Sequence, residues 1–145
     1  LQDRTIAETA VQTIREIRPD LSFIYLEGTD IAGHEYGWMS DEYLLAVSRA
    51  DRALEIILDG LPQDAPNQGF NILLLSDHGG IGMHHMESSK EVLTIPWIGI
   101  GPSIKKKHKI KSKLSVVDVA PTLAHLLDLK PHWSWEGKGA EEMFI

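Results

Sequence analysis

The sequence has 145 residues, a formal net charge of −7 and no cysteine, and 43% of its residues are hydrophobic. These totals fit one globular domain with a real core, and they exclude disulfides, thiolate zinc sites and cysteine nucleophiles. The negative charge argues against a nucleic-acid-binding surface, and no apolar stretch approaches the roughly 18 residues that span a membrane.

The first third of the chain predicts a helix, a strand and a polar loop. Residues 4–18 place apolar side chains at helical spacing, and Pro19 stops the pattern. The run "LSFIYL" at 21–26 is short, apolar and rich in branched or aromatic residues, which indicates a buried strand. The segment "EGTDIAGHEYGW" at 27–38 contains three glycines, and we expect a shaped loop without regular structure.

The middle of the chain predicts a second helix and two further strands. Ser40 can cap this helix, which Gly60 ends. The run "FNILLLS" at 70–76 is apolar throughout, as expected of a strand covered on both faces. A glycine- and histidine-rich loop follows, and "TIPWIGI" at 94–100 is the third expected strand.

The last third holds a basic run and a closing helix. The run "IKKKHKIKSK" at 104–113 contains six of the fourteen Lys and Arg residues and no acid. We expect a solvated loop or an edge strand, where lysines discourage strand pairing; steering of an anionic substrate is the alternative. Residues 115–129 read as a helix in which Ser115 and Asp118 resemble a capping box.

This alternation of helices and buried strands predicts an α/β fold, a mostly parallel sheet with helices on both faces. Ligands of such sheets bind beyond the carboxyl ends of the strands. Both polar loops fall at such ends, after Leu26 and after Leu75. The functional site is therefore expected there.

These two loops concentrate residues that bind metals. Carboxylates and imidazoles without cysteine suit a hydrolytic zinc site, or manganese or another first-row metal. The candidate ligands are Asp30 and His34 in the first loop, and Asp77, His78, His84 and His85 in the second. A simpler alternative is that the histidines only satisfy backbone groups.

Five segments together resemble the alkaline phosphatase superfamily, and within it the type I phosphodiesterase/nucleotide pyrophosphatase family: "DIAGHEYG", "LLLSDHGG", "TIPWIGIGPSIKK", "VDVAPTLAHLLDL" and "WEGKGAEEMF". The similarity runs from about Leu21 to Ile145. It implies that residues 1–145 are the C-terminal portion of one alkaline-phosphatase-like catalytic domain, which is incomplete because the N-terminal portion is absent.

The resemblance also implies two divalent metal ions, with zinc as the expected metal. One ion would be bound by Asp30, His34 and His85. The family's later histidine usually precedes glycine, whereas this chain reads "HHME", so His84 remains a rival to His85. The other ion would be bound by Asp77 and His78, together with an Asp and a Thr or Ser nucleophile upstream of this chain.

The implied activity is hydrolysis of phosphodiester or nucleotide pyrophosphate bonds in a small phosphate-containing substrate. No Ser or Thr of the chain fits the role of nucleophile: Ser76 more naturally supports the loop that carries Asp77. The isolated 145 residues are therefore expected to be inactive.

Two other classes of function stay open. One is another activity of the superfamily: phosphonoacetate hydrolase, phosphomonoesterase, sulfatase or phosphomutase. The other is a non-catalytic metal-binding domain. The sequence assigns neither an oligomeric state nor a cellular location.

Overall fold

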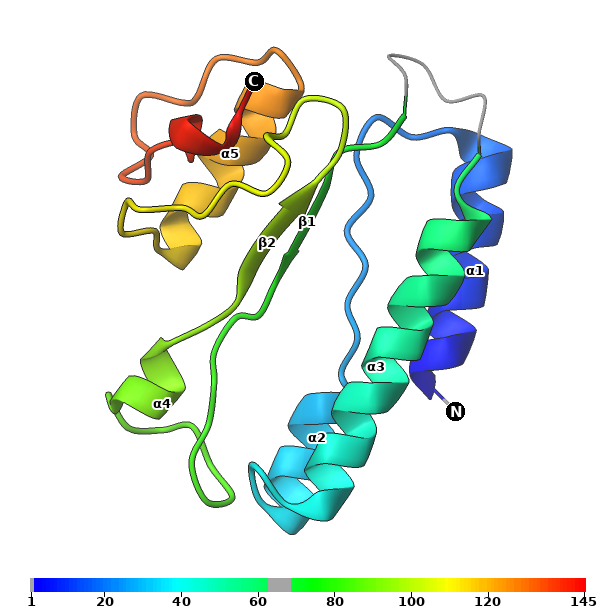
Figure 1. Cartoon of the computed structure of the whole chain (residues 1–145), viewed down its shortest axis with the longest axis vertical. Helices are drawn as coiled ribbons and strands as arrows, with labels where there is room; N and C mark the ends of the chain where they lie inside the picture. The colour runs from blue at the N-terminus through cyan, green and yellow to red at the C-terminus, as the bar shows by residue number, and fades with distance from the viewer. Residues whose placement is uncertain (1, 63–68) are drawn as a thin grey trace. The chain divides into compact units, whose positions relative to one another are not determined.

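The computed structural model describes residues 2–62 and 69–145 (Figure 1). The chain forms two compact units. The helical unit comprises residues 2–62 and 78–95, and the sheet unit comprises residues 69–77 and 96–145. Within the described ranges, no helix is both long and apolar enough to cross a membrane.

The helical unit is built on two long helices that pack against each other, α1 (Gln2–Ile17) and α3 (Asp41–Gly60) (Figure 1). Its core contains Ala7, Ala53 and Ile57, which are at most 7% exposed. The two alanines allow the helix backbones to approach closely. Both helices were expected from the sequence, as was the cap: the Ser40 hydroxyl accepts a hydrogen bond from the backbone N–H of Tyr43 at 3.1 Å.

The segment expected as an irregular loop is a helix, α2 (Gly28–Tyr36), so that prediction was wrong. The glycines of α2 do not make the segment irregular; they let neighbouring side chains approach the helix backbone closely. The backbone N–H of Gly28 donates to Asp3 Oδ1 at 3.2 Å, and a Cβ at this position would lie 2.3 Å from Asp3 Oδ2. Asp3, only 6% exposed, thereby satisfies a backbone donor at the start of α2.

The strand expected at 21–26 is also absent, since the segment has no regular secondary structure. It keeps some of the alternation of a strand: Ile24 and Leu26 pack on the core of the helical unit, whereas Phe23 is 89% exposed. A strand needs a neighbour to complete its hydrogen bonds, and none of the described strands pairs with this segment.

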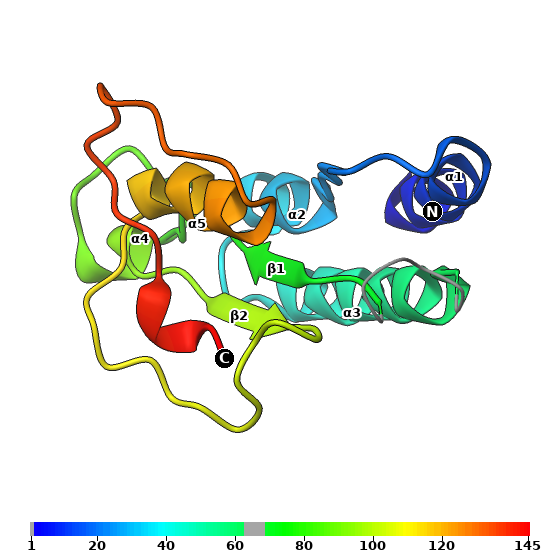
Figure 2. The ribbon, with the colours of Figure 1, turned by 90° about the horizontal axis from the view of Figure 1, so that it is seen from above.

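The sheet unit contains the two remaining strands, β1 (Ile72–Leu75) and β2 (Trp97–Ile100), which lie side by side in both ribbon views (Figures 1 and 2). They are antiparallel, so the parallel sheet expected from the sequence is not shown. Among the described residues the fold combines helices with this small antiparallel sheet. The one described helix between the strands, α4 (Lys90–Leu93), is far shorter than the crossover that a parallel pair needs.

After the basic run, a 3-10 turn, η2 (Val116–Asp118), leads into α5 (Val119–Leu126). The expected capping box is present, and the backbone N–H of Ser115 donates to Asp118 Oδ2 at 2.7 Å. The other carboxylate oxygen of Asp118 accepts from the backbone N–H of Lys138 at 2.7 Å. One side chain therefore caps the helix and ties the C-terminal tail to it.

The tail ends in a second 3-10 turn, η3 (Glu141–Met143). Ile104, Met143 and Phe144 are buried with Ala140 in one cluster, against which Leu73 and Trp97 of the two strands pack. The backbone N–H of Ala140 donates to the Thr122 hydroxyl at 2.9 Å. The C-terminal segment is thus part of the core of the sheet unit.

Candidate metal centre

The centre of the candidate site is one carboxylate oxygen, Oδ1 of Asp30. Asp30 lies in the first turn of α2, and His34 lies one turn further along the same face of the helix. The distance from His34 Nε2 to Asp30 Oδ1 is 3.6 Å. The side chains of Asp30 and His34 are 33% and 45% exposed, although Oδ1 of Asp30 itself is buried.

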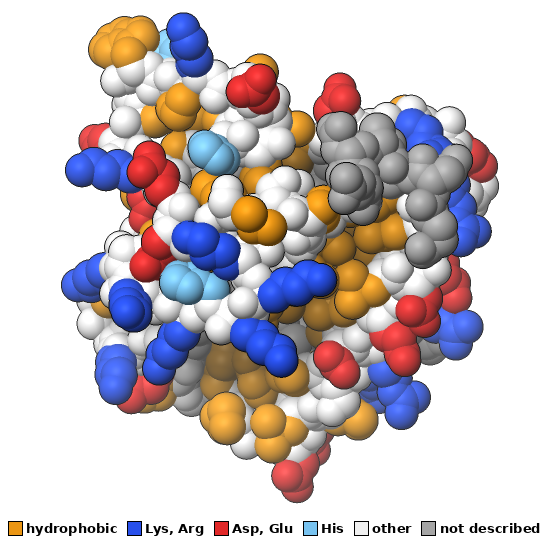
Figure 3. All heavy atoms as spheres, turned by 45° about the horizontal axis from the view of Figure 1, so that its top comes forward, with side chains coloured by type: hydrophobic (Ala, Val, Ile, Leu, Met, Phe, Trp, Pro, Cys, Tyr) orange, Lys and Arg blue, Asp and Glu red, His pale blue; other side chains and the backbone are white. Residues whose placement is uncertain are grey.

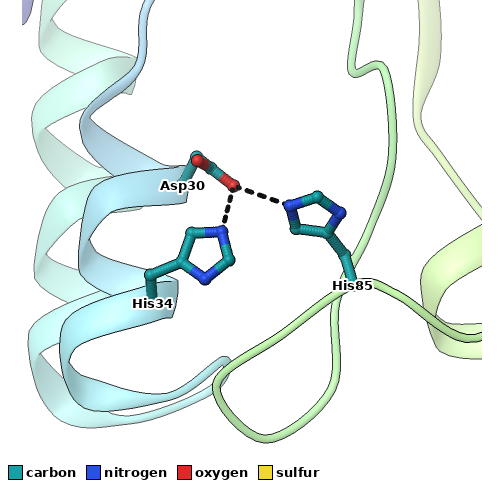
Figure 4. A group of neighbouring side chains, drawn as sticks. All are labelled: Asp30, His34 and His85. Carbon is teal, nitrogen blue, oxygen red and sulfur yellow. Dashed lines mark ion pairs between the residues drawn. The ribbon is translucent and has the colours of Figure 1, made fainter.

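Two further imidazoles face the same oxygen from the loop that precedes α4. His78 Nε2 and His85 Nε2 each lie 3.9 Å from Asp30 Oδ1. Figure 4 shows the rings of His34 and His85 converging on the carboxylate from α2 and from the loop. All four residues belong to the helical unit.

The spacing of these atoms fits an ion better than hydrogen bonds. Distances of 3.6 to 3.9 Å are too long for a hydrogen bond. Bonds of about 2.1 Å to a tetrahedral zinc ion separate neighbouring ligand atoms by roughly 3.4 Å. The candidate ligand atoms of Asp30, His34 and His85 all lie within 4.8 Å of one another.

Asp30 Oδ1 itself lacks a hydrogen-bond donor within the described part of the chain. It is buried, and no donor among the described residues makes a hydrogen bond to it. A buried carboxylate oxygen without a partner is costly, whereas a bound cation would satisfy it. The carboxylate and imidazole donors therefore fit a divalent metal ion.

Backbone carbonyls orient two of the imidazoles. His34 Nδ1 lies 3.0 Å from the carbonyl oxygen of Met83, and His78 Nδ1 lies 2.8 Å from that of Gly79. Because a carbonyl oxygen only accepts, each Nδ1 carries the proton and donates. With the proton on Nδ1, Nε2 is the ring nitrogen available to a metal ion, and it faces Asp30, the usual arrangement of metal-binding histidines.

An indole ring packs against the same imidazoles. Trp38 meets the rings of His34 and His85 edge to face, with centroids 5.1 and 6.0 Å apart. Two glycines make room for it: a Cβ on Gly33 or Gly80 would lie 2.7 or 2.1 Å from the indole. Sequence reasoning missed Trp38, although it lies four residues after His34 and directly after Gly37.

Tyr43 is the other aromatic residue at this site, with its ring 6.1 Å from that of Trp38. Partial burial raises the pKa of the Tyr43 phenol, and the charge of Asp30 raises it further. The phenol is therefore neutral at physiological pH and adds no second negative charge beside Asp30.

The structure separates His84 from His85. His84 is exposed, and its backbone pairs with that of Ile81 in both directions, at 3.0 and 3.1 Å. Of the two, His85 is the one that faces Asp30. Asp77 is exposed and belongs to the sheet unit, so its expected role at a second ion stays a prediction, as does that of His78.

Comparison with known proteins extends this picture. The profile of the family described as type I phosphodiesterase/nucleotide pyrophosphatase matches residues 2–127. Venom phosphodiesterase 2 of Crotalus adamanteus is 42% identical over 62 residues, which are 43% of this chain and 8% of that protein. Ectonucleotide pyrophosphatase/phosphodiesterase family member 1 of Homo sapiens is 30% identical over 109 residues, 75% of this chain and 12% of that protein. No solved structure matches significantly.

The profile match covers most of the chain, including the candidate metal ligands Asp30, His34 and His85. The chain is a member of the type I phosphodiesterase/nucleotide pyrophosphatase family. It spans only about a tenth of the length of the relatives named above.

Proposed function

We propose that this chain supplies the metal-binding part of a catalytic centre that hydrolyses phosphodiester or nucleotide pyrophosphate bonds. Asp30, His34 and His85 would hold one divalent ion, with zinc as the expected metal. The observation that supports this most is the buried Asp30 Oδ1, which accepts no hydrogen bond from the described residues and is faced by three imidazole nitrogens. Membership of the family and the names of the relatives support the choice of bond.

Each residue has a defined task in this proposal. Asp30 supplies negative charge to the ion, and His34 presents Nε2 because Met83 holds the proton on Nδ1. Trp38 covers the flank of both histidines and limits their motion. Divalent ions bound here would neutralise the phosphoryl oxygens and allow an acidic chain, of net charge −7, to accept an anionic substrate.

A second ion completes the proposed centre. Asp77 and His78 would bind it, together with an Asp and a Thr or Ser nucleophile from sequence outside this chain. The described Ser89 does not suit the nucleophile's role, since its hydroxyl caps α4 by accepting from the backbone N–H of Val92 at 3.3 Å. We therefore propose that the isolated chain binds metal but does not hydrolyse the substrate.

The proposal includes the architecture of the longer protein. Residues 1–145 would form the C-terminal portion of an alkaline-phosphatase-like domain, in which a mostly parallel sheet is covered by helices on both faces. The exposed Phe23 and the irregular segment around it are consistent with a strand that gains its neighbour from the rest of that domain.

Hydrolysis of nitrophenyl esters by the longer protein that contains this chain tests the function. A diester, bis-p-nitrophenyl phosphate, is compared with the monoester p-nitrophenyl phosphate. We expect the diester to be preferred and its turnover to fall at least about a hundredfold in Asp30→Asn. His84→Ala is the matched control and should retain activity.

Two outcomes would contradict the proposal. Preference for the monoester would favour another activity of the superfamily. Full diesterase activity in Asp30→Asn would show that Asp30 is not part of the catalytic centre. For the isolated chain, diester hydrolysis that Asp77→Ala abolishes would refute the proposed inactivity.

A further inference from the structure

The basic run at 104–113 is held in place by one carboxylate, that of Glu142 in η3. Glu142 Oε1 accepts from the backbone N–H groups of Lys111 and Ser112, both at 2.7 Å, and from the Ser112 hydroxyl at 2.6 Å. These bonds, led by that of the Ser112 hydroxyl, lower the pKa of Glu142 from 4.5 to about 2. The far end of the run is therefore anchored, while its lysines are exposed, as expected of the solvated loop rather than the edge strand that the sequence left open.

The near end is fixed as well. Ile104 is 3% exposed in the core of the sheet unit and forms a backbone bridge with Phe144. The next residue, Lys105, donates from Nζ to the carbonyl oxygen of Glu142 at 3.0 Å. The run is thus an ordered strap between two anchors on the C-terminal segment.

A pocket of about 430 Å³ lies between this strap and β2, a volume within the range of small-molecule sites. Its lining residues belong to the sheet unit and combine an apolar wall with a cationic group. The apolar side chains are Trp97, Ile98, Ile104, Ile110 and Met143, and the basic ones are Lys105, His108 and Lys109.

The charges around this pocket are poorly compensated. Lys105 bonds to a carbonyl rather than to a carboxylate. His108 Nε2 lies 3.8 Å from Glu142 Oε2, but in the part of the chain that is described, none of the lysines of the run forms an ion pair. Figure 3 shows Lys and Arg side chains gathered around a histidine on the face in view. Like charges that lie close together repel, and a bound anion would relieve that repulsion.

We propose that this pocket binds a small organic anion, with a phosphate, sulfonate or carboxylate group attached to a flat apolar body. The anionic group lies between Lys105 and Lys109, and the apolar body packs on Trp97 and Ile110. The fixed strap keeps the pocket formed before the ligand arrives, which reduces the entropy lost on binding. The inference is independent of the metal centre.

Titration of the 145-residue chain with naphthalene-1-sulfonate tests the proposal, because this probe is anionic, flat and not hydrolysed. The readout is the NMR resonance of the Trp97 indole N–H, with the affinity taken from its shift. We expect saturable binding with a Kd of about 0.1 mM that is at least about tenfold tighter than for neutral naphthalene-1-sulfonamide or for inorganic sulfate.

Two variants, each of which removes one positive charge, distinguish binding in this pocket from general electrostatic attraction to the basic run. Lys109→Gln, which removes a lining charge, should weaken binding about tenfold. Lys106→Gln removes the same charge from an exposed position of the run that does not line the pocket, and it should change the affinity less than about twofold. Equal losses in the two variants, equal binding of the neutral sulfonamide, or no Trp97 shift at millimolar probe would each overturn the proposal.

Discussion

The imidazole ring of His85 stacks on that of His78, with centroids 3.7 Å apart and planes inclined by 19°. The seven-residue separation is closed by the two backbone hydrogen bonds between Ile81 and His84. This turn brings His85 back over His78 and leaves His84 exposed. The same geometry places both Nε2 atoms 3.9 Å from Asp30 Oδ1.

Gly80→Ala tests how tightly the site is packed. The new methyl group would lie 2.1 Å from the Trp38 indole, so the ring must shift. We expect the free energy of unfolding, measured in urea, to fall by about 1–3 kcal/mol. Gly139→Ala is the control, because its nearest contact would be an ordinary 3.5 Å. Equal stability of the two variants would show that the indole is not confined.

Trp38→Phe tests whether the indole positions the histidines. The smaller ring cannot contact His34 and His85 together, so both gain rotational freedom. We expect zinc affinity to fall about tenfold with unchanged stoichiometry, as measured by competition with a chromogenic chelator. Trp133→Phe alters an indole that is 89% exposed and should leave the affinity unchanged. Unaltered zinc binding in Trp38→Phe would argue against a positioning role.

Asp118→Ala tests the joint between α5 and the tail. Two backbone donors, those of Ser115 and Lys138, lose their acceptor at once. We expect a loss of about 1–2 kcal/mol in the free energy of unfolding. Asp118→Asn keeps an acceptor oxygen for one of the donors and should lose less. A stability unaffected by Asp118→Ala would mean that water replaces both bonds without penalty.

Glu142 predicts a pH dependence of stability. Its pKa is about 2 in the folded chain, against an ordinary value of 4.5. A carboxyl whose pKa is lowered by folding stabilises the fold above the ordinary pKa, and the contribution is lost as pH falls from about 4.5 towards 2. The stability difference between the native chain and Glu142→Gln should therefore shrink across this range in urea unfolding.

The adjacent Glu141→Gln is the control for charge alone, since Glu141 is exposed. Its difference from the native chain should vary less with pH. If Glu142→Gln were as stable as the native chain above pH 4.5, the negative charge of Glu142 would not strengthen the hydrogen bonds that hold the strap, since Gln keeps an Oε1 acceptor for them.

Local signals in the sequence predicted local structure well. Apolar periodicity and the caps at Ser40 and Ser115 indicated the long helices and α5, and the runs at 70–76 and 94–100 contain β1 and β2. Pairing is not a local property: the two described strands are antiparallel, so the mostly parallel sheet expected from the sequence is not shown, and none of the described strands pairs with 21–26.

The sequence likewise predicted the local features of the candidate site but not its tertiary contacts. Residue types and loop positions selected six candidates, of which the fold brings Asp30, His34, His78 and His85 together. Trp38 was missed because its role depends on tertiary contacts with Gly33 and Gly80. The glycines that suggested a loop at 27–38 instead allow α2 to pack closely, which only the folded neighbours reveal.

Zinc binding to the 145-residue chain and to two neighbouring histidine variants tests the central claim most directly. Isothermal titration in the presence of a competing chelator gives stoichiometry and affinity. We expect one zinc ion, an affinity reduced at least about tenfold in His85→Ala, and a change below about twofold in His84→Ala. An equal or larger loss in His84→Ala, or undiminished affinity in His85→Ala, would contradict a metal centre built on Asp30, His34 and His85.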